Sequence, residues 1–156
     1  MLETPIYKAI DESKIDWMFV SKNPNAIPIL EQNLDKLNWW NLAENPNAIH
    51  ILEKNLNKVN WYELSRNPNA IHLLEKNLAK VDWYWLSLNP NAIPILENNL
   101  DKIDWFYLSE NPNAIYILQK NLDKVNWECL SENPKDRKST RLNSSHPSRS
   151  RMPSSA

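Results

Sequence analysis

The sequence predicts an all-α fold, a right-handed solenoid of short helix pairs that repeats every 22 residues. Tryptophan recurs at this interval, Asn-Pro pairs recur at the same interval, and the residues around both have helical spacing. The tryptophans are Trp17, Trp39, Trp61, Trp83, Trp105 and Trp127. The pairs are Asn23-Pro24, Asn45-Pro46, Asn67-Pro68, Asn89-Pro90, Asn111-Pro112 and Asn133-Pro134. Because the interval never changes, we expect an unbroken stack of like units.

The first helix of each unit follows an Asn or Asp, both good N-cap residues: Asp16, Asn38, Asn60, Asp82, Asp104 and Asn126. It then reads W-x-x-L-S or a close variant, which places Trp and Leu on one face. It ends at the Asn before proline, because that residue is pushed out of the α region. The same extended conformation suits an N-cap. We therefore expect Asn67 to end one helix and cap the next, with Pro68 at the first helical position.

The second helix, NPNAIHLLEKN in the central unit, places Ala70, Ile71 and Leu74 on one side. The chain has no glycine, the usual residue for ending a helix in the left-handed region. Asparagine recurs at that position instead. We therefore predict positive φ at Asn33, Asn55, Asn77, Asn99 and Asn121.

Helices this short are marginally stable by themselves in water, so the units must stabilise one another. We expect each unit to bury its Trp, Leu and Ile side chains against its neighbours, with the tryptophans in the core. Residues 1–15 are expected to form a degenerate N-terminal half-unit, in which Thr4-Pro5 opens a cap helix. Residues 16–135 are the solenoid, which we expect to be truncated at its C-terminal end.

The last segment, residues 136–156, has neither helical period nor strand alternation and is rich in Ser, Arg and Pro. It is expected to be disordered. Its sequence, DRKSTRLNSSH to SRMPSSA, resembles the translation of a common sequencing adapter. We therefore interpret it as read-through and expect the natural protein to continue differently.

The charge of the repeat region argues against a phosphate-backbone partner. The tail holds five of the 18 basic and one of the 19 acidic residues, so residues 1–135 carry 13 basic and 18 acidic side chains, a net charge of −5. A single cysteine, Cys129, indicates a reducing compartment. No signal sequence or membrane span is apparent. We expect a cytoplasmic protein, monomeric apart from its truncated end.

The motif LSxNPNAIxxLExNLDKVxW, which recurs over residues 16–134, resembles tandem-repeat proteins of giant viruses of the mimivirus kind and of related metagenomic sequences. Its NPN-helix portion is also similar, more distantly, to leucine-rich-repeat-variant solenoids. These resemblances imply a helical solenoid and, for a viral protein, a location in the host cytoplasm. They imply no particular activity.

Candidate binding residues are those that differ between units. The residues directly after each tryptophan are expected to be half-buried between units: Met18, Trp40, Tyr62, Tyr84, Phe106 and Glu128. The next positions are expected to face away from the core: Phe19, Asn41, Glu63, Trp85, Tyr107 and Cys129. Trp85 and Tyr107 come from adjacent units and are predicted to form an aromatic patch suitable for a partner, with Phe19 in the same row. Extra packing between units is the alternative interpretation.

His50 and His72 occupy equivalent positions on successive second helices and are also candidate partner-binding residues. They are expected to be neighbours. A zinc site needs further ligands, and no Cys or His cluster supplies them, so we predict no metal and no cofactor.

The sequence predicts a protein-interaction scaffold rather than an enzyme, since it has no Gly-rich phosphate loop, no nucleophile elbow and no asymmetric acid–base pair. The partner is expected to be another protein. The alternative is nucleic-acid binding along a repeated lysine ladder: Lys36, Lys58, Lys80, Lys102 and Lys124. A repeated acidic ladder, Glu31, Glu53, Glu75 and Glu97, favours a solvated face instead.

Overall fold

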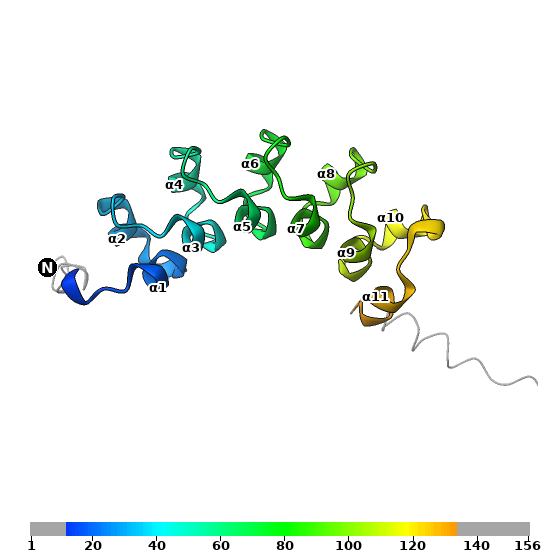
Figure 1. The fold of residues 1–156 in the computed structure, drawn as a ribbon, viewed down its shortest axis with the longest axis horizontal. Helices are drawn as coiled ribbons and strands as arrows, with labels where there is room; N and C mark the ends of the chain where they lie inside the picture. The colour runs from blue at the N-terminus through cyan, green and yellow to red at the C-terminus, as the bar shows by residue number, and fades with distance from the viewer. Residues whose placement is uncertain (1–11, 134–156) are drawn as a thin grey trace, which may run out of the picture.

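The computed structural model describes residues 12–133, which are helical and contain no strand. Figure 1 shows two rows of short helices along an arc. The inner row holds the first helices, α1 (Trp17–Lys22), α3 (Trp39–Glu44), α5 (Trp61–Arg66), α7 (Trp83–Leu88), α9 (Trp105–Glu110) and α11 (Trp127–Glu132). The outer row holds the second helices, α2 (Ile27–Gln32), α4 (Ile49–Glu53), α6 (Ile71–Glu75), α8 (Ile93–Glu97) and α10 (Ile115–Gln119). Three 3₁₀ turns complete the described range, η2 (Glu12–Lys14), η3 (Pro24–Ala26) and η4 (Leu122–Lys124). The predicted all-α solenoid of 22-residue units is confirmed.

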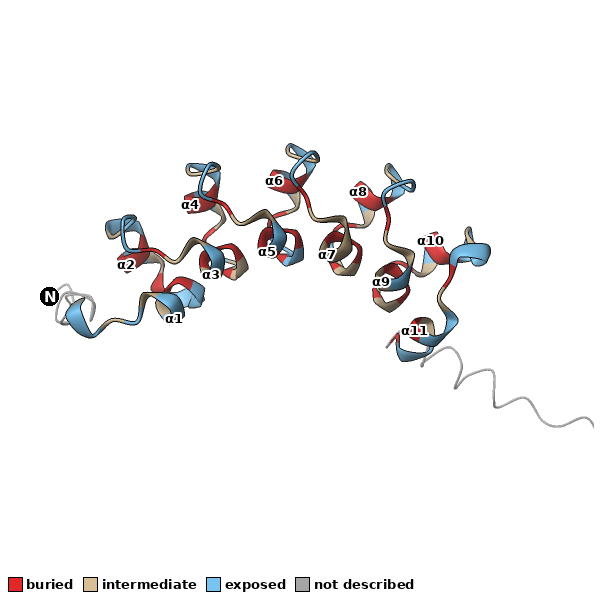
Figure 2. Ribbon diagram, in the orientation of Figure 1, coloured by how far each residue is buried: buried red, intermediate tan, exposed pale blue. Residues whose placement is uncertain are grey.

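The units stack mainly through their first helices, each of which packs on the first helix of the next unit. Buried residues occur in both rows along the whole arc, while the outer turns are exposed (Figure 2). The core is one continuous cluster whose centre is a set of nearly or fully buried leucines: Leu30, Leu42, Leu52, Leu64, Leu74, Leu86, Leu96, Leu108 and Leu118. No unit has a separate core, so burial by neighbours is what stabilises each helix pair.

The first helices begin and end as the sequence predicts. The Asn60 Oδ1 atom accepts a hydrogen bond of 2.9 Å from the Glu63 backbone N–H, which caps α5. Asn67 then has the extended backbone expected before proline, with φ −75° and ψ 114°. Its N–H donates to the Leu64 carbonyl and its Oδ1 accepts from the Asn69 N–H. Asn67 therefore ends α5 as predicted. Its side chain caps only the turn that follows, because the N-cap of α6 is Ala70, which makes no side-chain cap bond.

The second helices begin later than predicted. Pro68 and Asn69 form a turn closed by a 3.1 Å hydrogen bond from the Ala70 N–H to the Asn67 carbonyl, and α6 begins at Ile71. The prediction that Pro68 starts the α-helix is therefore wrong. The reason is local, because the i→i+3 bond to the Asn67 carbonyl and the bond from the Asn69 N–H to Asn67 Oδ1 make the first turn tighter than an α-helix. The Asn69 side chain also donates to the Pro46 carbonyl and so ties this turn to the preceding one. Proline starts a helical turn at Pro24, where the turn is 3₁₀.

The asparagines that end the second helices also differ from the prediction. No residue in the described range has a positive φ, so the left-handed conformation expected at Asn33, Asn55, Asn77, Asn99 and Asn121 is wrong. Asn33 has φ −136° and ψ 48°. Instead, each side-chain amide donates to the carbonyl four residues earlier at 2.8–3.0 Å, as Asn77 does to Leu73. Glycine has no side chain for this bond, which accounts for asparagine at these positions.

A ladder of buried asparagines connects the units. The pre-proline residues Asn45, Asn67, Asn89, Asn111 and Asn133 are at most 3% exposed. Each side-chain amide donates to two backbone carbonyls of the preceding unit, and Asn89 reaches the Ser65 and Asn67 carbonyls at 2.9 and 3.1 Å. The polar groups that the turns bring into the core are thereby satisfied by the next unit.

Buried serines form a second inter-unit link. The Ser65 hydroxyl donates to the Trp61 carbonyl at 2.7 Å and accepts from the backbone N–H of Asp82, in the next unit, at 3.0 Å. Ser21, Ser87 and Ser109 make the same pair of bonds. The equivalent residue in α3 is Ala43, which is fully buried and has no hydroxyl.

Replacing the serine by alanine is expected to destabilise the protein, and replacing the alanine by serine is expected to stabilise it. Ser65→Ala removes the acceptor of the half-buried Asp82 N–H and should lower the free energy of unfolding by about 1–3 kcal/mol. Ala43→Ser restores the repeated link and should raise it by up to about 1 kcal/mol. Urea denaturation of both variants provides the measurement. Equal losses in the two variants would contradict this account of the serine.

Three sequence predictions concern residues outside the described range. These are the cap helix at Thr4-Pro5, the end of the solenoid at Lys135 and the tail 136–156. Within residues 12–133, no helix is both long enough and apolar enough to cross a membrane.

Candidate functional site

The variable positions of the first helices form a continuous row of rings, which we call the aromatic strip. It consists of Trp40 from α3, Tyr62 from α5, Tyr84 and Trp85 from α7, and Phe106 and Tyr107 from α9. Successive ring centroids lie 6.0 Å apart for Trp40–Tyr62, 5.3 Å for Tyr62–Trp85, 4.6 Å for Trp85–Tyr84, 3.7 Å for Tyr84–Tyr107 and 4.9 Å for Tyr107–Phe106. The strip therefore crosses four consecutive units without a break.

The exposure of most residues at the two variable positions is the reverse of the prediction, although Tyr84 is half-buried as predicted. The first position is exposed at Trp40 (51%), Tyr62 (41%) and Phe106 (47%), where half-burial was expected. The second position was expected to face away from the core, yet Glu63 and Cys129 are buried and Trp85 and Tyr107 are half-buried. Phe19 is exposed as predicted, at 68%.

The contacts explain this reversal. Each ring at the second position packs on the first-position ring of the preceding unit, as Trp85 does on Tyr62 and Tyr107 on Tyr84. The first helix of the preceding unit thus covers the second variable position and leaves the first variable position exposed to solvent. Trp85 and Tyr107 are brought together as predicted, although through Tyr84 between them.

Trp85 is the most firmly held ring of the strip. The Arg66 guanidinium carbon lies 4.2 Å from its ring centroid, within the range of a cation–π contact. Arg66 Nη1 is itself 3.4 Å from Oε2 of Glu63, whose side chain is 6% exposed. The Trp85 Nε1 atom is buried with no hydrogen-bond partner. Ring and guanidinium are therefore fixed together before any partner arrives.

Tyr107 stays neutral over the physiological pH range. A hydrogen bond with Tyr84, together with burial and nearby carboxylates, raises the pKa of the Tyr107 hydroxyl to about 12. The strip thus adds no charge of its own. Beside it, burial and the Glu110 carboxylate raise the pKa of the Cys129 thiol, so this cysteine is held in its less reactive protonated form.

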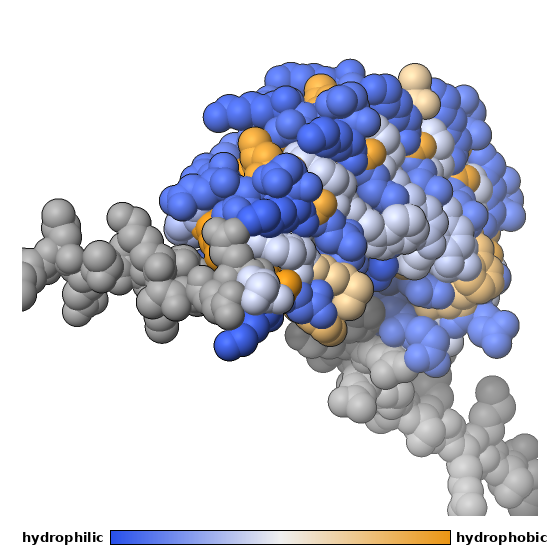
Figure 3. Space-filling model, turned by 60° about the vertical axis from the view of Figure 1, so that its left-hand side comes forward, coloured by the Kyte–Doolittle hydropathy of each residue, from blue (hydrophilic) through white to orange (hydrophobic). Residues whose placement is uncertain are grey.

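The first helices around the strip carry more carboxylates than cations. The cations are Lys22, which pairs with Glu44, and Arg66, which pairs with Glu63. The carboxylates of these helices and their N-caps are Asp16, Glu44, Glu63, Asp82, Asp104, Glu110, Glu128 and Glu132. The face shown in Figure 3 is mostly hydrophilic, with separate hydrophobic patches and a pale region of intermediate hydropathy between them. The first helices and their N-caps thus carry more acids than bases, and the lysines that lie over the tryptophans of these helices add positive charge next to them.

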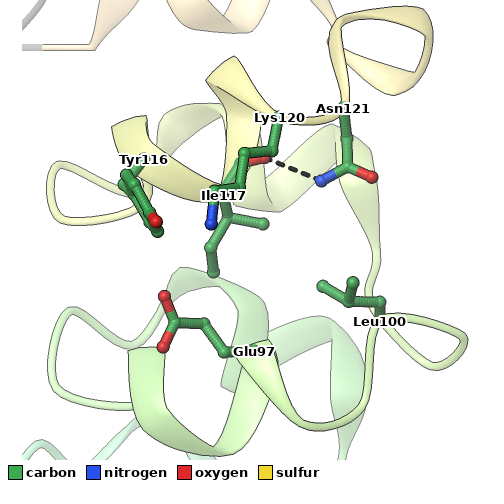
Figure 4. A pocket seen from close by; sticks show the side chains of 6 residues that line it. All are labelled: Glu97, Leu100, Tyr116, Ile117, Lys120 and Asn121. Carbon is green, nitrogen blue, oxygen red and sulfur yellow. Dashed lines mark hydrogen bonds between the residues drawn. The ribbon is translucent and has the colours of Figure 1, made fainter.

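The outer row has open notches between successive second helices. The notch between α8 and α10 has a volume of about 300 Å³ and is lined by Glu97, Leu100, Tyr116, Ile117, Lys120 and Asn121 (Figure 4). Lys120 Nζ lies 3.9 Å from the Tyr116 ring centroid. His50 lines the corresponding smaller notch between α2 and α4, where its Nε2 is 2.8 Å from Glu31 Oε1. Each notch combines an acid and a base in a shallow site.

His50 and His72 are exposed on successive second helices, α4 and α6. The nearest charged partner of His50 is a carboxylate, Glu31. Over residues 12–133, no three His, Cys, Asp or Glu side chains are grouped so that they would hold a metal ion.

The lysine and tryptophan ladders are interleaved. Each lysine ammonium group lies over the tryptophan ring 19 residues earlier, at 5.5 Å for Lys36–Trp17, 4.9 Å for Lys58–Trp39, 5.1 Å for Lys80–Trp61, 5.1 Å for Lys102–Trp83 and 4.8 Å for Lys124–Trp105. These five tryptophans are half-buried at the edge of the core, and Trp127 is 62% exposed. The tryptophans predicted to lie in the core therefore pack against its edge, where a lysine lies over each of these five rings, and Trp127 is wrong as a core residue. The constant Trp-to-Lys spacing was the sequence signal for this contact.

No protein-family model matches this chain, and neither the curated proteins nor the solved structures include a significant match. The resemblance to giant-virus repeats stays a prediction. Function must accordingly be inferred from the geometry of the surface.

Proposed function

We propose that the protein is an interaction scaffold that binds another protein through the aromatic strip. The observation that carries this proposal is the unbroken ring contact from Trp40 to Phe106 across four units. Exposed Trp and Tyr side chains are the residues that contribute most to binding at protein interfaces. Phe19, on α1, would extend the same row.

The stack has other links between units besides these rings. The leucines of the core are already buried, and the asparagine and serine ladders connect the units. Arg66 fixes Trp85 in advance, so a partner would lose less conformational entropy on ordering this surface. A preorganised aromatic row with exposed rings, as at Trp40, Tyr62 and Phe106, is typical of a binding surface.

Nucleic-acid binding along the lysine ladder is the second candidate, favoured by the regular spacing of five exposed lysines. It ranks below the first because each ammonium group already contacts a tryptophan ring. The net charge of −5 over residues 1–135 also opposes a polyanion.

A random peptide library displayed on phage and single-stranded RNA are the probes that separate the two candidates. We expect the protein to enrich specific peptides, and the Trp40→Ala/Phe106→Ala double variant to lose that enrichment by about tenfold or more. Tyr116→Ala, on the outer row and 57% exposed, is the matched control and should bind like the wild type.

RNA binding is expected to be negligible near physiological salt. Enrichment that persists in the double variant would contradict a role for the strip. Tight RNA binding that weakens steeply with salt and is lost in Lys58→Gln/Lys80→Gln would favour the second candidate.

A further inference from the structure

We propose that the partner of the aromatic strip places an acidic side chain, the carboxylate of an aspartate or glutamate, in the hollow between α5 and α7, where it accepts hydrogen bonds from the Arg66 guanidinium. This inference rests on the proposed function and names the charged group by which the partner is recognised. Arg66 would then fix the position of the partner along the strip.

The hollow between α5 and α7 adjoins the strip at Trp85. It has a volume of about 200 Å³ and is lined by Arg66, Trp85, Leu88, Asn89 and Pro90. The Asn89 side chain is buried and already bonded to backbone groups. Arg66 is the one charged residue of this lining, and the indole ring and Leu88 are apolar walls beside it. A ligand group that enters the hollow therefore meets a single cation between apolar side chains.

The Arg66 guanidinium is held in place and still has donors to offer. Its central carbon lies 4.2 Å from the Trp85 ring centroid, so the indole covers one side of it. A guanidinium has five N–H donors, and within residues 12–133 Arg66 uses one of them, from Nη1 to Glu63 Oε2 at 3.4 Å. The side chain is 48% exposed. The remaining N–H groups can therefore donate to a carboxylate, whose two oxygens match the planar fork of arginine.

The equivalent hollow one unit earlier has a different charge. It lies between α3 and α5, has a volume of about 170 Å³ and is lined by Glu44, Glu63, Arg66, Asn67 and Pro68. Glu44 and Glu63 occupy the positions that Arg66 and Trp85 occupy 22 residues later. These two carboxylates would repel an acidic side chain, so it is directed to the hollow between α5 and α7.

Arg66 is distinctive among the helices that carry the strip. The last residues of α3, α5, α7 and α9 are Glu44, Arg66, Leu88 and Glu110, so a cation occurs once at this position. The rings of the strip recur from unit to unit and would accept an apolar ligand in several registers. A single guanidinium beside them favours one register, because only there does the carboxylate of the ligand find its donors.

The lysine ladder adds attraction for an acidic ligand without choosing a unit. One lysine lies over the tryptophan that begins each of these four helices: Lys58 over Trp39, Lys80 over Trp61, Lys102 over Trp83 and Lys124 over Trp105. Arg66 is at the opposite end of α5 from Trp61. Because each helix has its lysine, these charges do not distinguish one unit from the next, whereas Arg66 does.

Glu63 competes with the ligand for the guanidinium. Its side chain is 6% exposed, and its oxygen lies 3.4 Å from Arg66 Nη1. A strong charge-assisted hydrogen bond of this kind measures about 2.7–2.9 Å, so the internal pair leaves room for a better acceptor. Removing the charge of Glu63 should therefore strengthen the binding of an acidic ligand. If Arg66 only braced Trp85, the same change would loosen the brace and weaken binding.

The test begins with selection from the phage-displayed random peptide library and continues with fluorescence-anisotropy titration of the full chain by the enriched peptides. We expect these peptides to carry an acidic residue at a constant sequence separation from an aromatic or aliphatic one. Replacing that acid by its amide should weaken binding to the wild type by about tenfold or more.

Three variants separate recognition by Arg66 from general attraction. Glu63→Gln should bind the acidic peptide about threefold more tightly or better. Adding Arg66→Met to Glu63→Gln should weaken the acidic peptide by about tenfold or more and leave its amide version within about twofold. Lys102→Gln is the matched control, since it also removes one positive charge beside α7, and it should change the affinity by less than about twofold. Circular dichroism of each variant checks that the helices are retained.

Equal affinity for the acidic peptide and its amide version would overturn the proposal, and so would weaker binding of the acidic peptide to Glu63→Gln. A phosphoserine version that binds more than about tenfold tighter than the acidic peptide would assign the hollow to a phosphate instead. If the library yields peptides without an acidic residue that depend on Trp40 and Phe106, this inference fails while the interaction scaffold stands. If it yields none that depends on those rings, both proposals fail.

Discussion

Replacing Asn89 with alanine is expected to lower the free energy of unfolding by about 3–5 kcal/mol, a large part of the stability of an ordinary domain. The Asn89 side chain is 1% exposed and donates to the Ser65 and Asn67 carbonyls. Its Oδ1 also accepts from the Asn91 N–H at 3.0 Å. Alanine leaves two buried carbonyls and one N–H without their partner, at about 1–3 kcal/mol for each group that stays dry.

The matched control is Asn91→Ala, two residues along the same turn. Asn91 also donates across a unit boundary, to the Pro68 carbonyl at 3.0 Å, but it is exposed and water can replace the bond. Asn91→Ala should lower the free energy of unfolding by no more than about 1 kcal/mol. Urea denaturation monitored by circular dichroism gives both values. Similar losses for the two variants would show that the buried asparagine ladder does not contribute as its geometry indicates.

The positions at which the first helices begin and end were predictable from the sequence, because they depend on local rules. An Asn or Asp before Trp caps a helix, and proline forces the residue before it into an extended conformation. Asn60 and Asn67 have these roles in the structure. The fixed interval then requires the units to stack, whatever the details of each turn.

The ends of the second helices were not predictable in the same way. Asparagine after a helix is consistent with a left-handed backbone, and it is equally consistent with a side chain that caps a carbonyl four residues earlier. Asn77 takes the second form, with its Nδ2 atom 2.8 Å from the Leu73 carbonyl. Asparagine at this position is compatible with both conformations, so only the three-dimensional structure distinguishes them.

The aromatic strip was predicted in part. Variation between units pointed to Trp85 and Tyr107, and the structure joins them through Tyr84. Trp40 and Tyr62 were predicted to be half-buried, and both are exposed. The prediction used their angle around the helix axis, which describes one helix without its neighbours. Burial at these positions depends on which side the preceding first helix covers, and a single unit does not contain that information.

Two different sets of contacts keep the units in register. The hydrogen bonds of Ser65 and Asn89 join backbone groups across unit boundaries, whereas Lys80 covers Trp61 at the surface. The hydrogen bonds join a unit to its immediate neighbour, and the Lys80–Trp61 contact lies within one 22-residue period. The ring-to-ring distances of the strip are therefore set by contacts between neighbouring units. The number of units can then be changed without changing those distances elsewhere in the stack.

Deleting one whole period, residues 61–82, is expected to leave a folded solenoid that is one unit shorter. Asn60 would then cap the helix that begins at Trp83, as it caps α5 now. Asn89 would donate to the Ala43 and Asn45 carbonyls, the two groups that Asn67 contacts at 2.8 and 3.3 Å. The asparagine ladder is thereby rebuilt from equivalent residues, and the new boundary follows Ala43 and has no serine link, as between α3 and α5 now. The free energy of unfolding should fall by about 2–5 kcal/mol, the scale of one lost interface.

Deleting half a period, residues 61–71, is the matched control and is expected to abolish cooperative unfolding of the array. It joins Asn60 to His72, so a second-helix sequence follows directly on a first-helix cap and the core leucines on either side fall out of register. Thermal unfolding followed by circular dichroism compares the two deletions. If the half-period deletion is tolerated better than the full-period deletion, the chain is not held by nearest-neighbour stacking. Only the deletion of a full period lets Asn89 find the two carbonyls that Asn67 contacts now.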